Sequence, residues 1–381
     1  MTGQRVLRGA LVFALIAAGV YFRYYHGVIF EQNHLCQIDF PAMYAGGKLA
    51  GTPAIYDPAA VLNLERKSIG CENQILLFIK PPYYALLLSP FSRFSPRAAY
   101  LAWFVAMASA AGVFVWLWPG NRWVTLLATV WFVPVGDSAI GGQDVTLLLL
   151  FLSAGILLLK KGWLFSSGLF FGLLFGKFHL FFLLPLFLIR KKLWRTIAGA
   201  CAMLSALLVI SIWSAGGGLR RVSAWYNVLQ DKRIETFVEI MPNLRGLLVY
   251  LPGLFWYALV AALALAIFLI LKGSFETAWI AVVLGGILTS PHVYCPDLAL
   301  LLPGLLTLTR LKGRLTKMWA VWLLLPFAFF WTPRWTYPAS LAVLLVLMTV
   351  ETLWDAKAGE HGTIAVPILP VSRPAPVEQL S

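Results

Sequence analysis

The stretch FFGLLFGKFHLFFLLPLF, residues 170–187, decides how this chain folds. It is apolar throughout, apart from Lys177 and His179 near its middle. A lysine at the centre of a bilayer costs about 2.5–3.5 kcal/mol on insertion scales, so the position of the membrane surfaces decides whether Lys177 can be tolerated. Basic clusters flank the run, with Lys160 and Lys161 before it and residues 190–192 after it.

A single crossing by this run would leave one of the two basic clusters on the outer side, against the positive-inside rule. Two short helices that meet near Lys177 return both clusters to the inner side. Each would have about 12–14 residues, which is short for a hydrocarbon core of about 30 Å. We therefore expect a helical hairpin with Lys177 at its outer tip, where a cation suits a lipid phosphate. The alternative is a lysine that reaches any headgroup along its aliphatic stem.

The composition places the whole chain in a membrane. Of 381 residues, 60% are hydrophobic and 12% are charged, and the mean hydropathy is +0.80. These values exclude a soluble globular domain and indicate an all-α polytopic membrane protein. The net charge of +14 does not indicate a nucleic-acid partner, because lysine and arginine gather at the ends of apolar runs.

Apolar runs predict about twelve transmembrane helices. The predicted ranges are 8–23, 98–118, 123–137, 145–159, 163–176, 178–189, 196–214, 250–271, 276–290, 297–309, 317–331 and 337–354. The first follows a basic start without a cleavage site, which indicates an uncleaved helix. Residues 76–96 are apolar but carry four prolines, Lys80 and Arg93, so we expect a juxtamembrane segment there.

The charge pattern supports one topology, with the N-terminus inside. Every second loop is then inside and basic, whereas the short outer loops GDSAIGGQD and SPHVYCPD contain no lysine or arginine. Two outer loops are long, at about 24–97 and 215–249. We expect residues 1–354 to form one integral membrane domain and the proline-rich residues 355–381 to form a disordered cytoplasmic tail. Cys36 and Cys71 both lie in the first outer loop. The sequence leaves open whether they form a disulfide or remain two free thiols.

Three aspartates follow turns and precede helical patterns. Asp57 stands before Pro58 and an amphipathic run, which is typical of a helix N-cap. Asp144 follows GGQ at the start of an apolar run and is also interpreted as a cap. Asp39 precedes Pro41 and is open to two interpretations. It caps a helix, or it acts as a base whose pKa is raised by its apolar neighbours.

Several short motifs occur in one order on the outer side. They are DF…Y…G…YD from Asp39, KPP from Lys80, GQD at 142–144, the hairpin run around Lys177, and SPHVYCPDLALLLP from Ser290. Together, over about residues 35–310, they resemble glycosyltransferase family 87, a family of polyprenyl-phosphate-sugar-dependent transferases of the GT-C class. The resemblance implies a GT-C-like helical bundle with juxtamembrane helices in the first outer loop.

The resemblance also implies roles for individual residues. Asp39 would be the catalytic base, the donor phosphate would be bound by Lys177, His292 and Lys80, and substrate would be bound by Tyr44, Gln143, Asp144 and Tyr294. No two histidines share an i, i+4 helix face and no nucleotide-binding motif occurs, so we expect neither a metal site nor a cofactor. The donor would then be a lipid-linked sugar phosphate.

The implied reaction moves a hexose, with mannose as the expected sugar, from a polyprenyl-phosphate donor to the hydroxyl of a lipid or glycan acceptor. It would proceed by single displacement with inversion, on the periplasmic side of a bacterial inner membrane, with both termini cytoplasmic. Two alternatives remain open. One is a transporter or flippase of a lipid-linked sugar, and the other is a pentose (arabinose) transferase of the same class. In each case the partners are lipid-linked sugar and membrane lipids.

Overall fold

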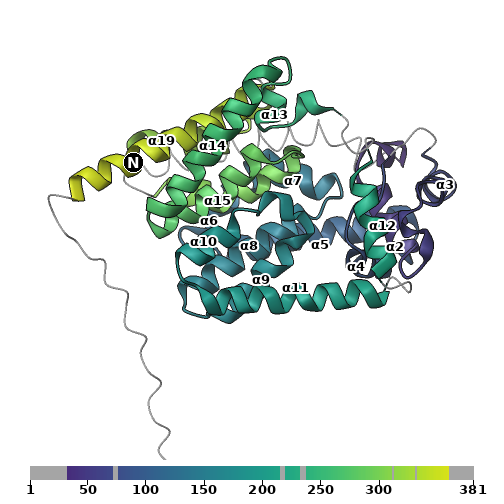
Figure 1. Cartoon of the computed structure of the whole chain (residues 1–381). Helices are drawn as coiled ribbons and strands as arrows, with labels where there is room; N and C mark the ends of the chain where they lie inside the picture. Colours follow the sequence, from purple (N-terminus) through teal and green to yellow (C-terminus); the bar gives the residue numbers. More distant parts are fainter. Residues whose placement is uncertain are drawn as a thin grey trace, which may run out of the picture.

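A computed structural model describes residues 32–71, 76–214, 219–231, 237–310, 313–330 and 333–359. Regular structure in these residues is helical throughout (Figure 1). The helix expected at 8–23 and the tail beyond residue 359 lie outside the described residues. The fold class predicted from composition, an all-α protein, is confirmed for the described part of the chain.

Four helices in the described part of the chain are long and apolar enough to cross a membrane. They are α5 (Pro96–Leu117), α11 (Trp194–Ser214), α14 (Pro252–Lys272) and α19 (Thr336–Gly359). A fifth span is formed if α6 (Arg122–Trp131) and α7 (Val133–Ile140) are taken together, although they bend by 63° at their junction. The twelve spans expected from apolar runs are not confirmed, because most of those runs form helices too short to cross alone.

The remaining helices of the bundle are short. They are α8 (Val145–Lys160), α9 (Leu164–Leu173), η3 (Leu174–Leu180), α10 (Leu184–Arg190), α12 (Leu219–Leu229), η5 (Val238–Ile240), α13 (Leu244–Leu247), α15 (Phe275–Thr289), η6 (Cys295–Leu301), α16 (Leu302–Leu308), α17 (Arg314–Leu324) and α18 (Phe327–Phe330). Several of them are apolar and lie in the middle of the bundle, where longer helices surround them (Figure 1).

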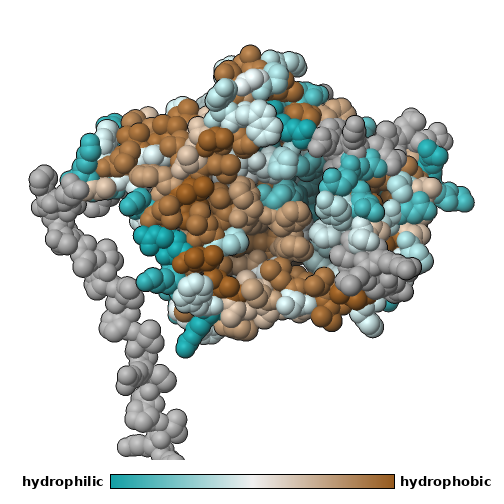
Figure 2. Space-filling model, in the orientation of Figure 1, coloured by the Kyte–Doolittle hydropathy of each residue, from teal (hydrophilic) through white to brown (hydrophobic). Residues whose placement is uncertain are grey.

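The basic loops gather at one end of the bundle. The Arg190 side chain donates through Nε to the carbonyl of Leu271 at 3.2 Å, and Lys160 forms an ion pair with Glu276 at 2.7 Å. These contacts join loops that alternate topology places on the same side. Figure 2 shows hydrophilic groups at this end and on the side that carries α3 and α12, with a broad hydrophobic surface between them.

The hairpin predicted around Lys177 is confirmed. The helix α9 ends at Leu173, and the backbone leaves helical geometry at Lys177 (φ −134°, ψ 53°) before α10 begins at Leu184. Glycines let the first arm pack closely on α11, since a Cβ on Gly168 would lie 2.0 Å from the Thr196 carbonyl oxygen. Lys177 therefore sits at a break between two helices that are each too short to span a bilayer.

The segment predicted to be the first outer loop folds into short helices, which share a hydrophobic core with α5. They are η1 (Gln32–Gln37), α2 (Phe40–Lys48), η2 (Pro53–Tyr56), α3 (Pro58–Ile69) and α4 (Pro82–Ser92). The cap predicted at Asp57 is confirmed, because its carboxylate accepts from the Ala59 N–H at 2.9 Å and Pro58 occupies the first helical position. Residues 76–96 were predicted not to cross the membrane. The helix in this segment, α4, has only eleven residues, which supports that prediction.

A disulfide joins Cys36 to Cys71 across 35 residues of this loop, with the Cα atoms 5.3 Å apart. Of the two states left open by the sequence, the structure therefore has the disulfide. Cys36 lies three residues before Asp39, so the crosslink restrains the segment that leads into α2. A disulfide between these residues also fits a loop on the oxidising side of a membrane.

We expect Cys36→Ser to lower the free energy of unfolding by about 2–4 kcal/mol, because the crosslink no longer restricts the unfolded chain. Thermal unfolding of the detergent-purified protein, with and without reductant, measures this effect. Cys201→Ser is the matched control, since Cys201 is an exposed free cysteine. The expectation would be contradicted if Cys36→Ser had the melting temperature of the wild type and both cysteines were free thiols in the native protein.

Candidate active site

Asp39 lies immediately before α2 and points to a neighbouring turn instead of capping its own helix. Its backbone N–H donates to the Gly141 carbonyl at 3.1 Å, and its Oδ2 accepts a hydrogen bond from Nε2 of Gln143. Its side chain makes no cap hydrogen bond to α2. The residue as a whole is half-buried, which makes it less buried than Asp144 and Asp297.

The turn that presents Gln143 requires glycine. Gly142 has a φ of +74°, and a Cβ there would lie 2.5 Å from the Cβ of Phe40. Helix α5 anchors the turn through two buried side chains. Trp103 donates to the Gly142 carbonyl at 2.9 Å, and Tyr100 donates to the Ile140 carbonyl at 2.8 Å. The GGQD motif is therefore a rigid support that holds Gln143 against Asp39.

Gln143 connects Asp39 to Lys177. The Lys177 ammonium donates to Oε1 of Gln143 at 3.1 Å and forms an ion pair with Asp297. Asp297 is held in turn, since its Oδ2 accepts from the Tyr294 N–H at 2.9 Å. Lys177 is 9% exposed and Asp297 is 1% exposed. A continuous polar network thus runs from the first outer loop, through the GGQD turn and the hairpin tip, to η6.

A second buried ion pair lies beside this network. The Lys80 ammonium contacts both carboxylate oxygens of Asp144, at 2.8 and 3.0 Å, and Asp144 is fully buried. The main chain at Lys80 is fixed by Tyr56, whose hydroxyl donates to the Lys80 carbonyl at 2.7 Å. Asp144 precedes α8 but makes no cap hydrogen bond, so the interpretation of Asp144 as a cap was wrong. Its carboxylate serves as the counter-ion of Lys80.

The charges single out one carboxylate. Asp144 and Asp297 each have a lysine at ion-pair distance, whereas Asp39 is bonded to the neutral amide of Gln143. Burial raises the pKa of Asp39 above its usual value, although the Gln143 hydrogen bond and the Lys177 and Lys80 charges oppose the shift. A carboxyl group with a raised pKa and no ion-pair partner among the described residues can take up and release a proton, as a general base must.

The structure brings His292 and Tyr294 next to the network, and both are less buried than Lys177 and Asp297. Their rings meet edge to face with centroids 4.8 Å apart, and the His179 ring lies 6.3 Å from that of His292. Tyr44, a predicted substrate-binding residue, lies instead in the core of the first loop. It is 4% exposed and its hydroxyl donates to the Phe94 carbonyl at 3.0 Å, so it stays outside the network.

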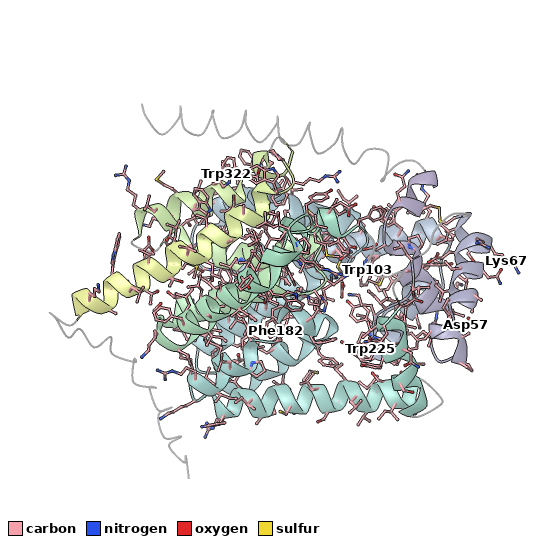
Figure 3. The ribbon with its side chains drawn as sticks, turned by 45° about the horizontal axis from the view of Figure 1, so that its top comes forward. Asp57, Lys67, Trp103, Phe182, Trp225 and Trp322 are labelled. Atoms are coloured by element: carbon pink, nitrogen blue, oxygen red, sulfur yellow. A yellow bond between two sulfur atoms is a disulfide. The ribbon has the colours of Figure 1, made fainter. Side chains whose placement is uncertain are left out.

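Asp297 is the site residue that sequence reasoning missed. It is the single acidic residue of the motif SPHVYCPDLALLLP. A buried lysine requires a counter-ion, because an uncompensated buried charge is strongly destabilising. A search for the counter-ion of Lys177 among the acidic residues of the other motifs would have included Asp297. Asp57 belongs elsewhere, since it lies with Lys67 at the outer edge of the first loop, away from Trp103 (Figure 3).

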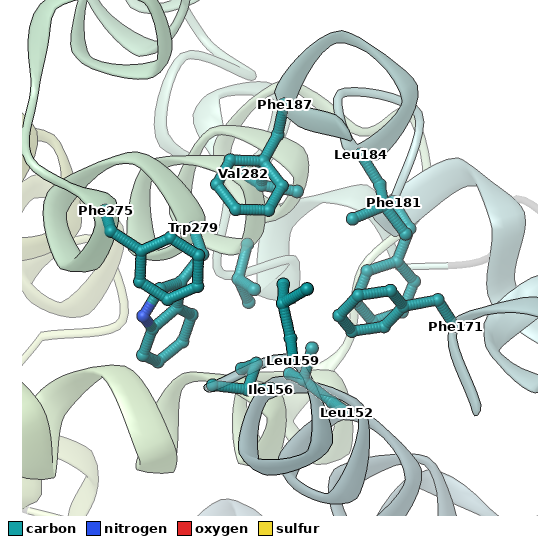
Figure 4. Close-up of a pocket in the computed structure, with 11 residues that line it drawn as sticks. Leu152, Ile156, Leu159, Phe171, Phe181, Leu184, Phe187, Phe275, Trp279 and Val282 are labelled. Atoms are coloured by element: carbon teal, nitrogen blue, oxygen red, sulfur yellow. The ribbon is translucent and has the colours of Figure 1, made fainter. Parts of the chain in front are cut away.

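An apolar pocket lies between α8, the hairpin and α15 (Figure 4). Its lining consists of Leu152, Ile156, Leu159, Phe171, Phe181, Leu184, Phe187, Phe275, Trp279, Val282 and Val283. The indole N–H of Trp279 is already bonded to Glu276 at 2.6 Å. A sugar or a phosphate would find no polar partner here, so the polar network is the candidate site.

These features define an all-helical protein with apolar membrane-length helices and a buried acidic and basic network. A comparison with known families matches residues 78–291, more than half of the chain, to glycosyltransferase family 87, and the chain belongs to that family. The matched range includes Lys80, Gln143, Asp144 and Lys177, and it excludes Asp39 and His292. No curated protein and no solved structure matches the chain.

Proposed function

We propose that this family 87 glycosyltransferase moves a hexose, with mannose as the expected sugar, from a polyprenyl-phosphate donor to an acceptor hydroxyl. The observation that carries the proposal is the environment of Asp39. It is the least buried acidic residue of the network, it has no ion-pair partner among the described residues, and Gln143 connects it to a buried cation. A base beside a cation is the pair that a displacement at a phosphate-activated sugar requires.

Asp39 and the nearby cations can account for every proton and bond in this reaction. Asp39 accepts the proton of the acceptor hydroxyl as its oxygen attacks the anomeric carbon, and the bond from that carbon to the phosphate oxygen breaks with inversion. Both electrons of the broken bond leave with the lipid phosphate, which needs cationic stabilisation and no general acid. A lysine ammonium has three N–H groups, and Lys177 uses two of them on Gln143 and Asp297. The third can donate to the phosphate, with Lys80 and His292 as further contacts.

The position of the network supports a lipid-borne donor that is used on the periplasmic side of the inner membrane. The basic loops around Lys160 and Arg190 gather at the opposite end of the bundle, which the positive-inside rule assigns to the cytoplasm together with both termini. The disulfide in the first loop agrees with an oxidising compartment on the side of Asp39. Lipid or glycan acceptors would approach from that side.

A transport assay and a transfer assay with the purified protein test the proposal. The protein is incubated with radiolabelled polyprenyl-phosphate mannose and a membrane lipid extract, and in parallel with the arabinose-bearing lipid or a sugar nucleotide. We expect labelled product from the mannose lipid alone. Product from the arabinose lipid alone would assign a pentose transferase. If the labelled lipid crossed the liposome membrane and no product formed, the protein would be a transporter.

A further inference from the structure

Two neighbouring tyrosine hydroxyls in the first turn of α4 are buried and make no full hydrogen bond with any described residue. They belong to Tyr83 and Tyr84, and Tyr84 as a whole is 4% exposed. A buried donor that makes no hydrogen bond costs about 1–3 kcal/mol. Most buried polar groups in proteins are paired for this reason, so each unpaired one requires an explanation.

Other buried tyrosines nearby do have partners. Tyr44, Tyr56 and Tyr100 each donate to a backbone carbonyl, at 3.0, 2.7 and 2.8 Å. Packing alone does not explain the hydroxyls of Tyr83 and Tyr84, because phenylalanine would fill the same space without the cost of an unpaired donor. The two hydroxyls therefore resemble binding groups whose partner is a ligand.

Both rings lie against the hairpin tip. A Cβ on Gly176, the residue before Lys177, would lie 3.5 Å from the Tyr83 hydroxyl oxygen and 3.6 Å from the Tyr84 ring. The Lys80 ammonium is 5.4 Å from the centre of the Tyr84 ring. The two phenols thus stand next to both lysines that we assign to the donor phosphate.

The local charge selects the kind of ligand. Burial, and then the negative charge of Asp144, raises the pKa of both phenols, so both remain protonated donors. The Tyr84 hydroxyl lies close enough to the Asp144 carboxylate for the contact to raise its pKa, but the contact does not meet the geometry of a full hydrogen bond. A phosphate oxygen could accept from the phenols but could not donate to Asp144, and a lipid chain would offer no acceptor. A sugar hydroxyl suits the position, because it accepts from a phenol and donates to a carboxylate.

We propose that Tyr83 and Tyr84, with Asp144, form a subsite that binds hydroxyl groups of the sugar carried by the donor. This inference rests on the proposed function and extends it to the part of the donor that distinguishes one sugar from another. A site that hydrogen-bonds a substrate hydroxyl discriminates strongly against an analogue that lacks it, because the buried groups of the site are then left unpaired.

The test uses Tyr83→Phe, Tyr84→Phe and the double variant, with Tyr337→Phe as the matched control. Tyr337 is also 4% exposed, but its hydroxyl donates to the Leu323 carbonyl at 3.4 Å. Each subsite variant should keep or slightly raise the melting temperature and lower kcat/KM for the sugar-bearing lipid about tenfold or more. The control should keep its kcat/KM. A double variant with the kcat/KM of the wild type would overturn the subsite and leave the transferase proposal intact.

Binding provides a second measurement that does not depend on transfer. The affinities of each protein for polyprenyl-phosphate mannose and for polyprenyl phosphate without sugar are compared. We expect the wild type to prefer the sugar-bearing lipid and the double variant to lose that preference, with its affinity for polyprenyl phosphate unchanged. This result in a protein that shows no transfer would support the subsite while the transferase proposal fails. Equal preference in wild type and double variant would overturn the subsite.

Discussion

Asp39→Asn is expected to lower kcat by about 10²–10⁴-fold, because asparagine fills the same space but cannot accept the proton of the acceptor hydroxyl. The fold should survive, since Asp39 takes part in no ion pair among the described residues and its removal leaves no lysine without a counter-ion. The KM for the donor should change little. Transfer from radiolabelled polyprenyl-phosphate sugar, measured on proteins of equal melting temperature, checks this expectation.

The pH profile gives an independent check on Asp39. A base must be ionised to act, and burial raises the pKa of this carboxyl group. The kcat/KM of the wild type should therefore rise with pH through that raised pKa and then level off, whereas the residual rate of Asp39→Asn should not show this rise. Asp57→Asn is the matched control, because Asp57 caps α3 and asparagine caps equally well. An Asp39→Asn protein with wild-type rate and profile would place the base elsewhere.

Lys177→Met is expected to be damaging in two ways. It removes a cation from the proposed phosphate site, and it leaves Asp297 as an uncompensated buried charge. Breaking a buried ion pair by removing one partner costs about 3–5 kcal/mol. We therefore expect a large fall in the free energy of unfolding together with loss of transfer, measured by thermal unfolding and by the transfer assay.

The double variant Lys177→Met/Asp297→Asn separates these two effects. It removes both charges, so most of the lost stability should return, whereas transfer should remain lost. Lys160→Met is the control for removal of a lysine, because its ion pair with Glu276 is about one-third exposed and such pairs contribute about 0–1 kcal/mol. A double variant that regains transfer would show that Lys177 serves only to balance Asp297.

Local patterns in the sequence predicted several features correctly. The Asp57–Pro58 cap depends on neighbouring residues, and the hairpin at Lys177 follows from basic clusters that must stay on one side of a membrane. The predicted number of spans is not confirmed, for a related reason. An apolar run shows that a segment is buried, but a segment buried inside a bundle and one that crosses a lipid bilayer have the same composition.

The sequence by itself determined the class of protein and the hairpin at Lys177, because apolar runs and charge asymmetry act through the membrane and need no partner. The outward position of Lys177 and the role of Asp39 as a base stay predictions. Only the tertiary structure decided which charges pair. Lys177 pairs with Asp297, which is 120 residues away in the sequence, and Gln143 bonds Asp39, which is 104 residues away. Lys80 pairs with Asp144, 64 residues away, and Asp144 does not cap α8 as expected. Such pairs form because desolvated charges must be compensated wherever the packed helices place them, and no local pattern records that placement.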